Sequence, residues 1–235
     1  MKTDIPQTVY LKDYTPPAFL VDTVDLDFVI ETGSTTVTAT LAVRRNPAVA
    51  AQPLVLDGDE LETLSVAVDG QKWPFSETPT QLTLSDLPGA FTLTTEVRIQ
   101  PDSNTRLSGL YRSKDGYFTQ CEAQGFRRIT WFLDRPDVMS TYTVTLHADK
   151  EKLPVLLANG NPVAAGDEAD GGHWAKWNDP FRKPAYLFAI VAGKLDGLFD
   201  SFTTASGRSV QLAIYVEPGK LDQCPHAMAA LQKSM

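Results

Sequence analysis

The sequence predicts a mainly β protein built from several antiparallel sheets. Its first two-thirds is a succession of short stretches in which apolar and polar residues alternate, which is typical of strands with one buried face. Turn-forming residues separate these stretches, and Asp69-Gly70 is a strong two-residue hairpin signal. A helical pattern occurs only near the end of the chain, from Asp222 onward.

Each alternating stretch predicts one strand, and the turns between them predict which strands pair. Residues 24–30 and 37–43 flank a turn at Glu31 to Ser34, so they are expected to form a hairpin. Lys114-Asp115-Gly116 and Asn159-Gly160 are further tight turns. The remaining predicted strands in this part of the chain are residues 64–68, 82–84, 91–99, 142–146 and 155–157.

The last fifth of the chain is predicted to belong to a second domain. Residues 185–192 are continuously apolar, which favours a strand buried on both faces, and Gly193 ends this run. We therefore expect one all-β domain over residues 1–192 and the beginning of another over 193–235. In the second part, residues 195–204 and 210–216 predict two strands, and Asp222 is the expected N-cap of a terminal helix. This tail is expected to pack against the first domain and to leave an apolar face exposed for a missing partner.

Composition limits the classes of partner. The chain of 235 residues has 29 acidic and 21 basic residues, a formal net charge of −8. Nucleic acids and anionic membranes are bound through basic patches, so this balance argues against both and agrees better with a cationic ligand. No stretch reaches the roughly 18 apolar residues of a membrane span, and MKTDIPQTVY lacks the apolar core of a signal peptide, so we expect a cytoplasmic protein. Cys121 and Cys224 are predicted to be free thiols.

The stretch TQCEAQGFRRITWFLDRPDV, residues 119–138, does not follow a strand pattern. Gln120, Glu122 and Gln124 share a parity, so an extended backbone would point three polar side chains to one side. If that side is a cleft, a carboxylate flanked by carboxamides suits a cationic ligand. The other interpretation, which the residues alone leave open, is that Glu122 lies on the solvent face of a strand and binds nothing.

Other residues in and near this stretch have structural interpretations. The proline in Asp134-Arg135-Pro136-Asp137 predicts a turn, and the charges there and at Arg127 and Arg128 favour ion pairing over catalysis. Trp131, Trp174 and Trp177 could form a sugar-binding platform, but tryptophans among strands favour the core.

The central stretch resembles a known family. Residues 119–127, TQCEAQGFR, and residues 132–137, FLDRPD, are similar to the N-terminal domain of the bacterial aminopeptidase N family of gluzincin zinc aminopeptidases. Further similar blocks follow in the same order, so the resemblance covers essentially the whole chain. They are Asn159-Gly160-Asn161, His173-Trp174, residues 177–181, residues 183–189, residues 202–204 and 206–208, and the last helix-like stretch.

The resemblance implies a fold, a site and an activity. It implies a saddle-like, multi-sheet β domain, with residues 193–235 forming the first strands and helix of a thermolysin-like catalytic domain. It also implies that Glu122 binds the α-ammonium of a peptide substrate with a free N-terminus and that Gln120 lines the pocket for the first side chain. The peptide bond between Glu122 and Ala123 is expected to be cis. Gln124 departs from the family pattern, which often has Glu there.

The motifs that carry the family's chemistry are absent from this sequence. It contains neither the Gly-Ala-Met-Glu-Asn exopeptidase motif nor a His-Glu-x-x-His zinc helix, and its three histidines lack that spacing. The resemblance thus implies zinc in a larger parent enzyme, with no metal site and no catalytic residue expected in this chain. The chain should be inactive alone, and the remainder of the catalytic domain should be its partner.

Two other classes of function remain alternatives. The first is a non-catalytic scaffold relative with the same fold, although a scaffold would not need an ammonium site at Glu122. The second, more remote, is a β-sandwich carbohydrate-binding module that uses its tryptophans.

Overall fold

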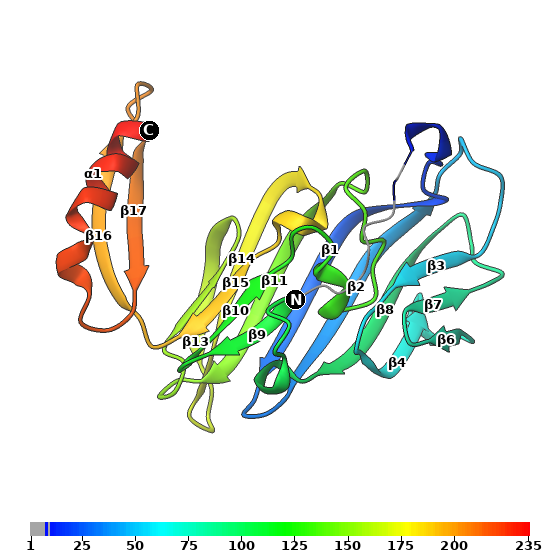
Figure 1. The fold of residues 1–235 in the computed structure, drawn as a ribbon, viewed down its shortest axis with the longest axis horizontal. Helices are drawn as coiled ribbons and strands as arrows, with labels where there is room; N and C mark the ends of the chain where they lie inside the picture. Colours follow the sequence, from blue (N-terminus) through cyan, green and yellow to red (C-terminus); the bar gives the residue numbers. More distant parts are fainter. Residues whose placement is uncertain (1–7, 9) are drawn as a thin grey trace.

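The structure, a computed structural model, describes Thr8 and residues 10–235, and its strands form four sheets (Figure 1). The expectation drawn from residues 1–10 therefore lies mostly outside the described residues. The largest sheet has eight strands in the order β13-β14-β11-β1-β2-β8-β4-β5. Smaller sheets follow the orders β12-β15-β10-β9, β3-β7-β6 and β16-β17. The strand bounds are β1 Phe19–Ile30, β2 Thr35–Arg45, β3 Leu54–Asp57, β4 Glu62–Val68, β5 Gln71–Lys72, β6 Ser76–Thr78, β7 Gln81–Leu84, β8 Ala90–Ile99, β9 Gly109–Ser113, β10 Gly116–Gln120, β11 Ser140–Asp149, β12 Val155–Ala158, β13 Asn161–Asp167, β14 Gly172–Lys183, β15 Ile190–Gly193, β16 Asp196–Thr203 and β17 Ser209–Val216.

Helical structure in the described residues is short. The helices are the 3-10 turns η1 Leu11–Asp13, η2 Pro101–Ser103, η3 Phe126–Arg128, η4 Ala185–Leu187 and η5 Leu221–Gln223, and the α-helix α1 Pro225–Ser234. No helix in the described part of the chain has the length and apolar character needed to cross a membrane. The prediction of a mainly β, multi-sheet fold is confirmed.

The predicted hairpins form where turn chemistry supports them. β1 and β2 pair antiparallel around the turn at Glu31 to Ser34, with Phe28 opposite Val37. Asp69 and Gly70 join β4 to β5, and both have a positive φ, which this kind of two-residue turn requires. One pairing departs from an antiparallel arrangement, because β1 also pairs in parallel with β11. The large sheet is therefore mixed.

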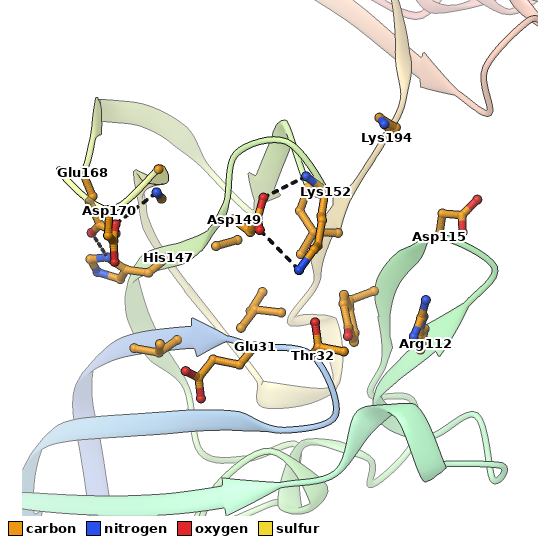
Figure 2. Close-up of a pocket in the computed structure, with 17 residues that line it drawn as sticks. Glu31, Thr32, Arg112, Asp115, His147, Asp149, Lys152, Glu168, Asp170 and Lys194 are labelled. Carbon is orange, nitrogen blue, oxygen red and sulfur yellow. Dashed lines mark hydrogen bonds and ion pairs between the residues drawn. The ribbon is translucent and has the colours of Figure 1, made fainter.

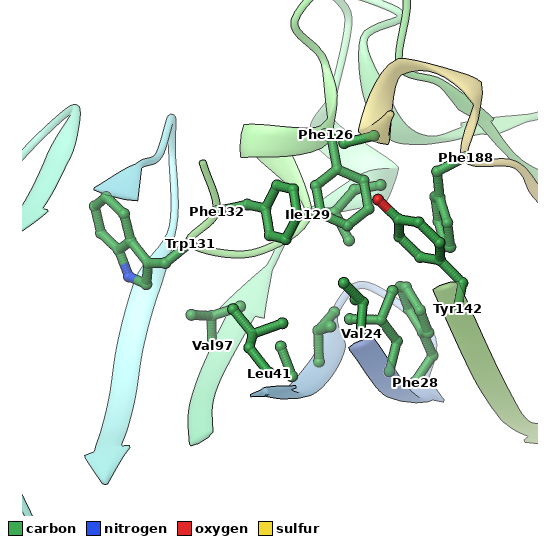
Figure 3. Close-up of a cluster of buried hydrophobic side chains, with 14 of the residues drawn as sticks. Val24, Phe28, Leu41, Val97, Phe126, Ile129, Trp131, Phe132, Tyr142 and Phe188 are labelled. Atoms are coloured by element: carbon green, nitrogen blue, oxygen red, sulfur yellow. The ribbon is translucent and has the colours of Figure 1, made fainter. Parts of the chain in front are cut away.

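The hydrophobic core lies against one face of the large sheet and includes part of the central stretch (Figure 3). Alternate residues of β1 and β2 point into it, among them Val24, Phe28 and Leu41. Phe126 packs edge-on against Phe132 at 4.9 Å between ring centroids and against Phe188 at 5.1 Å. Buried aromatic rings of this size contribute much of a core's stabilisation. The residues that follow Glu122 in the sequence are thus fixed by the core.

Two predicted elements differ from the structure. Residues 185–192 are not one buried strand: η4 occupies the start, and β15 begins only at Ile190. An apolar run does not reveal backbone conformation, and Leu187 is half exposed here. The terminal helix begins at Pro225 after η5, with Cys224 as N-cap and not Asp222. Proline suits the first position of a helix because its missing N–H has no intrahelical acceptor there.

The tail consists of the predicted two strands and a helix, but it stands apart from the larger body. β16 and β17 form a separate sheet with α1 on one face, at the left of Figure 1. Their link to the rest includes an ion pair between Lys114, in the β9–β10 turn, and Glu217. The tail was expected to pack against the first domain, and its contacts with that domain are limited: they include this ion pair and Tyr215, which lines a groove with residues of β12, β13 and β14. The other face of the hairpin carries Phe199, which is 64% exposed and packs edge-on against Tyr215.

Candidate functional site

Glu122 lies in a turn between a strand and a 3-10 helix. β10 ends at Gln120, residues 122–125 form the turn, and η3 begins at Phe126. The parity argument for Gln120, Glu122 and Gln124 is therefore wrong, since these residues do not share one strand. All three side chains are nevertheless exposed, because the turn projects them from the surface.

The turn brings the two predicted site residues together. The side-chain amide of Gln120 donates to the backbone oxygen of Glu122 at 3.2 Å. The carboxylate of Glu122 has no hydrogen bond or ion pair to any described residue. The peptide bond from Glu122 to Ala123 is cis, the geometry that the resemblance implies. An exposed anion beside a carboxamide can receive a cationic group.

A backbone hydrogen bond and close backbone contacts at Gly125 hold the turn together. The amide of Gly125 donates to the oxygen of Cys121 at 2.7 Å. A Cβ on Gly125 would lie 2.4 Å from the oxygen of Gln120, so only glycine fits here. Cys121 itself is a buried free thiol, and burial is the main cause that raises its pKa. Cys121 is therefore part of the support of the turn and not a nucleophile.

The charged residues after the turn are paired, as predicted. Arg127 donates to Asp134 through its backbone amide at 3.2 Å and its Nε at 2.9 Å. Burial raises the pKa of Asp134, and the contacts with Arg127 only partly offset this. Arg135 pairs with Asp137, which closes the turn at Pro136. These ion pairs hold the chain on both sides of the core aromatic residues.

Arg128 forms a second ion-pair cluster; the sequence predicted ion pairing for this residue but not its partners. Arg128 is buried and donates to Asp59 and Glu60, both at 2.5 Å, and to the oxygen of Ser108 at 3.0 Å. Its acidic partners precede it by almost 70 positions, so no local spacing connects them. The only sequence signal was the acidic run after the strand that ends at Asp57.

The tryptophans do not form a sugar-binding platform. Trp131 is 1% exposed, and its indole N–H donates to Thr63 at 2.8 Å. Trp174 and Trp177 are half buried and line an apolar groove of about 510 Å³ beside β12 and β13. The indole N–H of Trp177 donates to the oxygen of Leu156 at 3.2 Å. The other lining residues of the groove are mainly apolar residues of β12 and β13, together with His173, Lys176 and Tyr215.

A polar groove of about 680 Å³ lies at the opposite end of the β9–β10 hairpin from Glu122 (Figure 2). His147 contacts Glu168 at 2.7 Å through Nδ1 and Asp27 at 3.4 Å through Nε2. Lys152 pairs with Asp149 nearby. His147 and Lys152 therefore have acidic partners inside the groove, whereas Glu31, Asp115 and Lys194 line it without an ion pair to any described residue.

The residues of this chain do not fit a zinc site. Within residues 8 and 10–235, no group of three or more histidine, cysteine or acidic side chains could hold a metal ion. Zinc needs four ligands in close tetrahedral arrangement, usually with three from the protein at a catalytic site. His173 is instead in contact with the oxygen of Leu153 at 2.8 Å.

The fold, a mixed eight-stranded sheet with three smaller sheets, is that of the N-terminal β domain of M1-type peptidases. The family model for the peptidase M1 N-terminal domain matches residues 20–187, and this chain belongs to that family. The match covers the large sheet, the central stretch and the Glu122 turn.

Sequence relatives agree with this assignment. The chain is 49% identical to aminopeptidase N of Caulobacter vibrioides over 238 residues, covering 100% of this chain and 27% of that protein. It is 47% identical to aminopeptidase N of Escherichia coli over 234 residues, with 99% and 27% covered. The chain thus spans about a quarter of the length of these relatives.

A solved structure shows the same fold. The crystal structure of Legionella pneumophila aminopeptidase A in complex with aspartic acid matches with a TM-score of 0.90 and 31% identity, over 96% of this chain and 27% of that one. A crystal structure of an M1 zinc metallopeptidase from Deinococcus radiodurans bound to a Tyr-Ser-Ala substrate matches with a TM-score of 0.70. Its 18% identity supports the fold alone.

Proposed function

We propose that this chain is the N-terminal part of a zinc aminopeptidase that removes N-terminal residues from peptides, and that it supplies the wall of the cleft that binds the substrate's α-ammonium. The observation that carries this is the exposed carboxylate of Glu122, held on a tightly closed turn without a partner among the described residues. Relatives at 45% identity or more carry the name aminopeptidase N.

The proposed contribution of the chain is positioning. The Glu122 carboxylate accepts a charge-assisted hydrogen bond from the substrate's ammonium, which fixes the free end of the peptide. Gln120, held against the Glu122 backbone, lines the pocket for the first side chain. Zinc and bond cleavage belong to the remainder of the proposed parent enzyme, and no step assigned to this chain involves the metal.

The proposal is tested by Glu122→Gln in the full-length parent enzyme. The amide keeps the shape of the side chain but removes its charge. Hydrogen bonds to charged groups contribute about 1.5 to 3 kcal/mol, so kcat/KM on an aminoacyl substrate should fall about 10- to 150-fold. Zinc content and affinity for a zinc-binding inhibitor without an amine should stay the same, because Glu122 lies outside any metal site. Equal losses of kcat/KM and of inhibitor affinity, or no loss of either, would falsify the ammonium-binding role.

The same measurement separates the alternative of a non-catalytic scaffold. A scaffold relative would show neither zinc-dependent turnover nor an amine preference, and Glu122→Gln would be silent. An M1-type enzyme shows turnover that chelation removes, with Glu122→Gln affecting only amine-containing ligands.

The proposal includes a domain boundary and a cellular location. We place the boundary between the N-terminal domain and the first part of the catalytic domain after residue 192, with residues 193–235 in the latter. The exposed ring of Phe199, which packs edge-on against the half-buried Tyr215, supports contact with the remainder of that domain. A cytoplasmic location is also proposed, and cell fractionation tests it.

A further inference from the structure

The cluster around Arg128 joins three segments of the chain. Arg128 closes η3, and its backbone amide donates to the oxygen of Gly125, the last residue of the Glu122 turn, at 3.1 Å. Its guanidinium reaches Asp59 and Glu60, in the loop after β3. Its Nε donates to the oxygen of Ser108, directly before β9. Arg128 therefore joins the turn, through its backbone amide, to two other loops, through its side chain.

Gly109 is the point at which these segments meet. It pairs with Gln120, the last residue of β10, and it has a φ of +74°. A Cβ on Gly109 would lie 2.6 Å from the Cβ of Arg128 and 3.2 Å from the oxygen of Gly125. The end of the β9–β10 hairpin, the Glu122 turn and η3 are thus in direct contact, and a shift of Arg128 displaces the turn.

Burial distinguishes Arg128 from the other arginine in the cluster. The side chain of Arg128 is 6% exposed, whereas that of Arg106, which pairs with the same Asp59 and Glu60, is 63% exposed. A buried guanidinium with a fixed fork of donors holds its partners in one geometry. Arg106 lies on the exposed side of the same acidic pair and has no bond to the Glu122 turn.

We propose that Arg128 is a positioning residue that holds the Glu122 turn in the orientation needed to receive the substrate's α-ammonium. This inference rests on the proposed function. Glu122 is exposed and has no side-chain partner of its own among the described residues, so its direction is set by the backbone of the turn. A displacement on the order of 1 Å is enough to cost about 100-fold in rate at such a site.

The first test compares Arg128→Lys with Arg106→Gln in the full-length parent enzyme. Lysine keeps the charge but loses the fork that spans Asp59, Glu60 and Ser108. We expect kcat/KM on an aminoacyl substrate to fall about 10- to 100-fold, mainly through KM, with unchanged affinity for an amine-free zinc-binding inhibitor. Arg106→Gln, the matched control at the same acidic pair, should change neither quantity by more than about twofold. If Arg128→Lys does not fold, Asp59→Asn replaces it as the test variant. It removes one carboxylate partner of Arg128 and keeps the other, Glu60.

The second test combines Arg128→Lys with Glu122→Gln. Because Arg128 acts through Glu122, its replacement should cost little once the carboxylate is gone, so the two losses should not add. In the 235-residue chain alone, hydrogen exchange at the amide of Gly125 should become about tenfold faster in Arg128→Lys and stay unchanged in Arg106→Gln.

The outcomes of these tests distinguish the positioning role of Arg128 from the ammonium-binding role of Glu122. Full additivity in the double variant, or an equal loss of inhibitor affinity in Arg128→Lys, shows a general structural role and overturns the positioning proposal. If Glu122→Gln alone is silent, the ammonium-binding function fails, whatever Arg128 does.

Discussion

At the scale of single residues, the hydroxyl of Tyr142 is buried in the aromatic cluster and has no hydrogen-bond partner among the described residues. Burial of an unpaired hydroxyl is unfavourable. Tyr142→Phe should therefore leave the free energy of unfolding unchanged or raise it by up to about 1 kcal/mol. Urea unfolding followed by tryptophan fluorescence measures this.

Tyr117 provides the matched control. Its hydroxyl donates to Asp102 at 2.7 Å, and burial with this contact raises its pKa to about 12. Tyr117→Phe removes a bond to a charged acceptor and should lower the free energy of unfolding by about 1.5 kcal/mol. A greater loss in Tyr142→Phe than in Tyr117→Phe would contradict the assignment.

Asp22 gives the chain a testable dependence on pH. Arg44 donates to it at 2.7 Å and Arg182 at 3.1 Å, and these contacts, that of Arg44 foremost, lower the pKa of Asp22 below its usual 3.8. Its stabilising contribution is therefore fully present above pH 3.8 and is lost as the pH falls through the lower pKa of the folded state.

Asp22→Asn should accordingly lower the free energy of unfolding at pH 7 by about 0.5 to 1 kcal/mol, the usual size for a partly exposed ion pair. The difference from the original chain should shrink as the pH falls below 3.8. Asp25→Asn, on the same strand and without an ion pair among the described residues, is the control. A difference that persists at low pH would argue against the ion pair as its cause.

At the scale of elements, the loop after β3 is held against the core by Gly58. A Cβ at this position would lie 2.1 Å from the Trp131 ring, and the ring is fixed by its bond to Thr63. Gly58→Ala should lower the free energy of unfolding by about 2 to 3 kcal/mol through overpacking. Thermal unfolding tests this.

Gly70→Ala is the comparison. Gly70 has a φ of +76°, and no atom lies within 4 Å of the place that a Cβ would occupy, so only backbone strain of about 1 kcal/mol is expected. If both variants lose the same stability, the contact with Trp131 is not the cause.

The strands that could be predicted are those whose signal is local. The β1–β2 hairpin and the Asp69-Gly70 turn follow from alternation and turn chemistry between neighbouring stretches of the sequence. The parallel pairing of β1 with β11 and the η4 turn could not be predicted, because register across distant segments and the backbone of an apolar run leave no periodic trace.

In the candidate site, too, features with a local sequence signal could be predicted and contacts between distant segments could not. Gln120 and Glu122 were predicted as site residues through a family resemblance, whereas their spacing suggested a strand through Gln124, and β10 ends at Gln120. Ion pairing of Arg128 was predicted, but its partners could not be, because Asp59 and Glu60 approach it only in the folded chain.

At the scale of the whole molecule, the tail and the larger body should unfold independently. β16, β17 and α1 pair with one another, and an ion pair from Lys114 to Glu217 is among their few links to the rest. Removal of residues 193–235 should leave the remainder folded, with a thermal midpoint within about 3 °C of the original. A remainder that fails to fold would refute the proposed boundary after residue 192.

The parallel pairing of β1 with β11 also sets an order for folding during synthesis. β1 ends at Ile30, whereas β11 begins at Ser140, so the open edge of β1 stays uncovered until the ribosome has released most of the domain. At about 5 to 20 residues per second this takes on the order of ten seconds. An uncovered strand edge of this length can recruit a second nascent chain. Slow translation between β2 and β11 should therefore favour aggregation of this domain on polysomes.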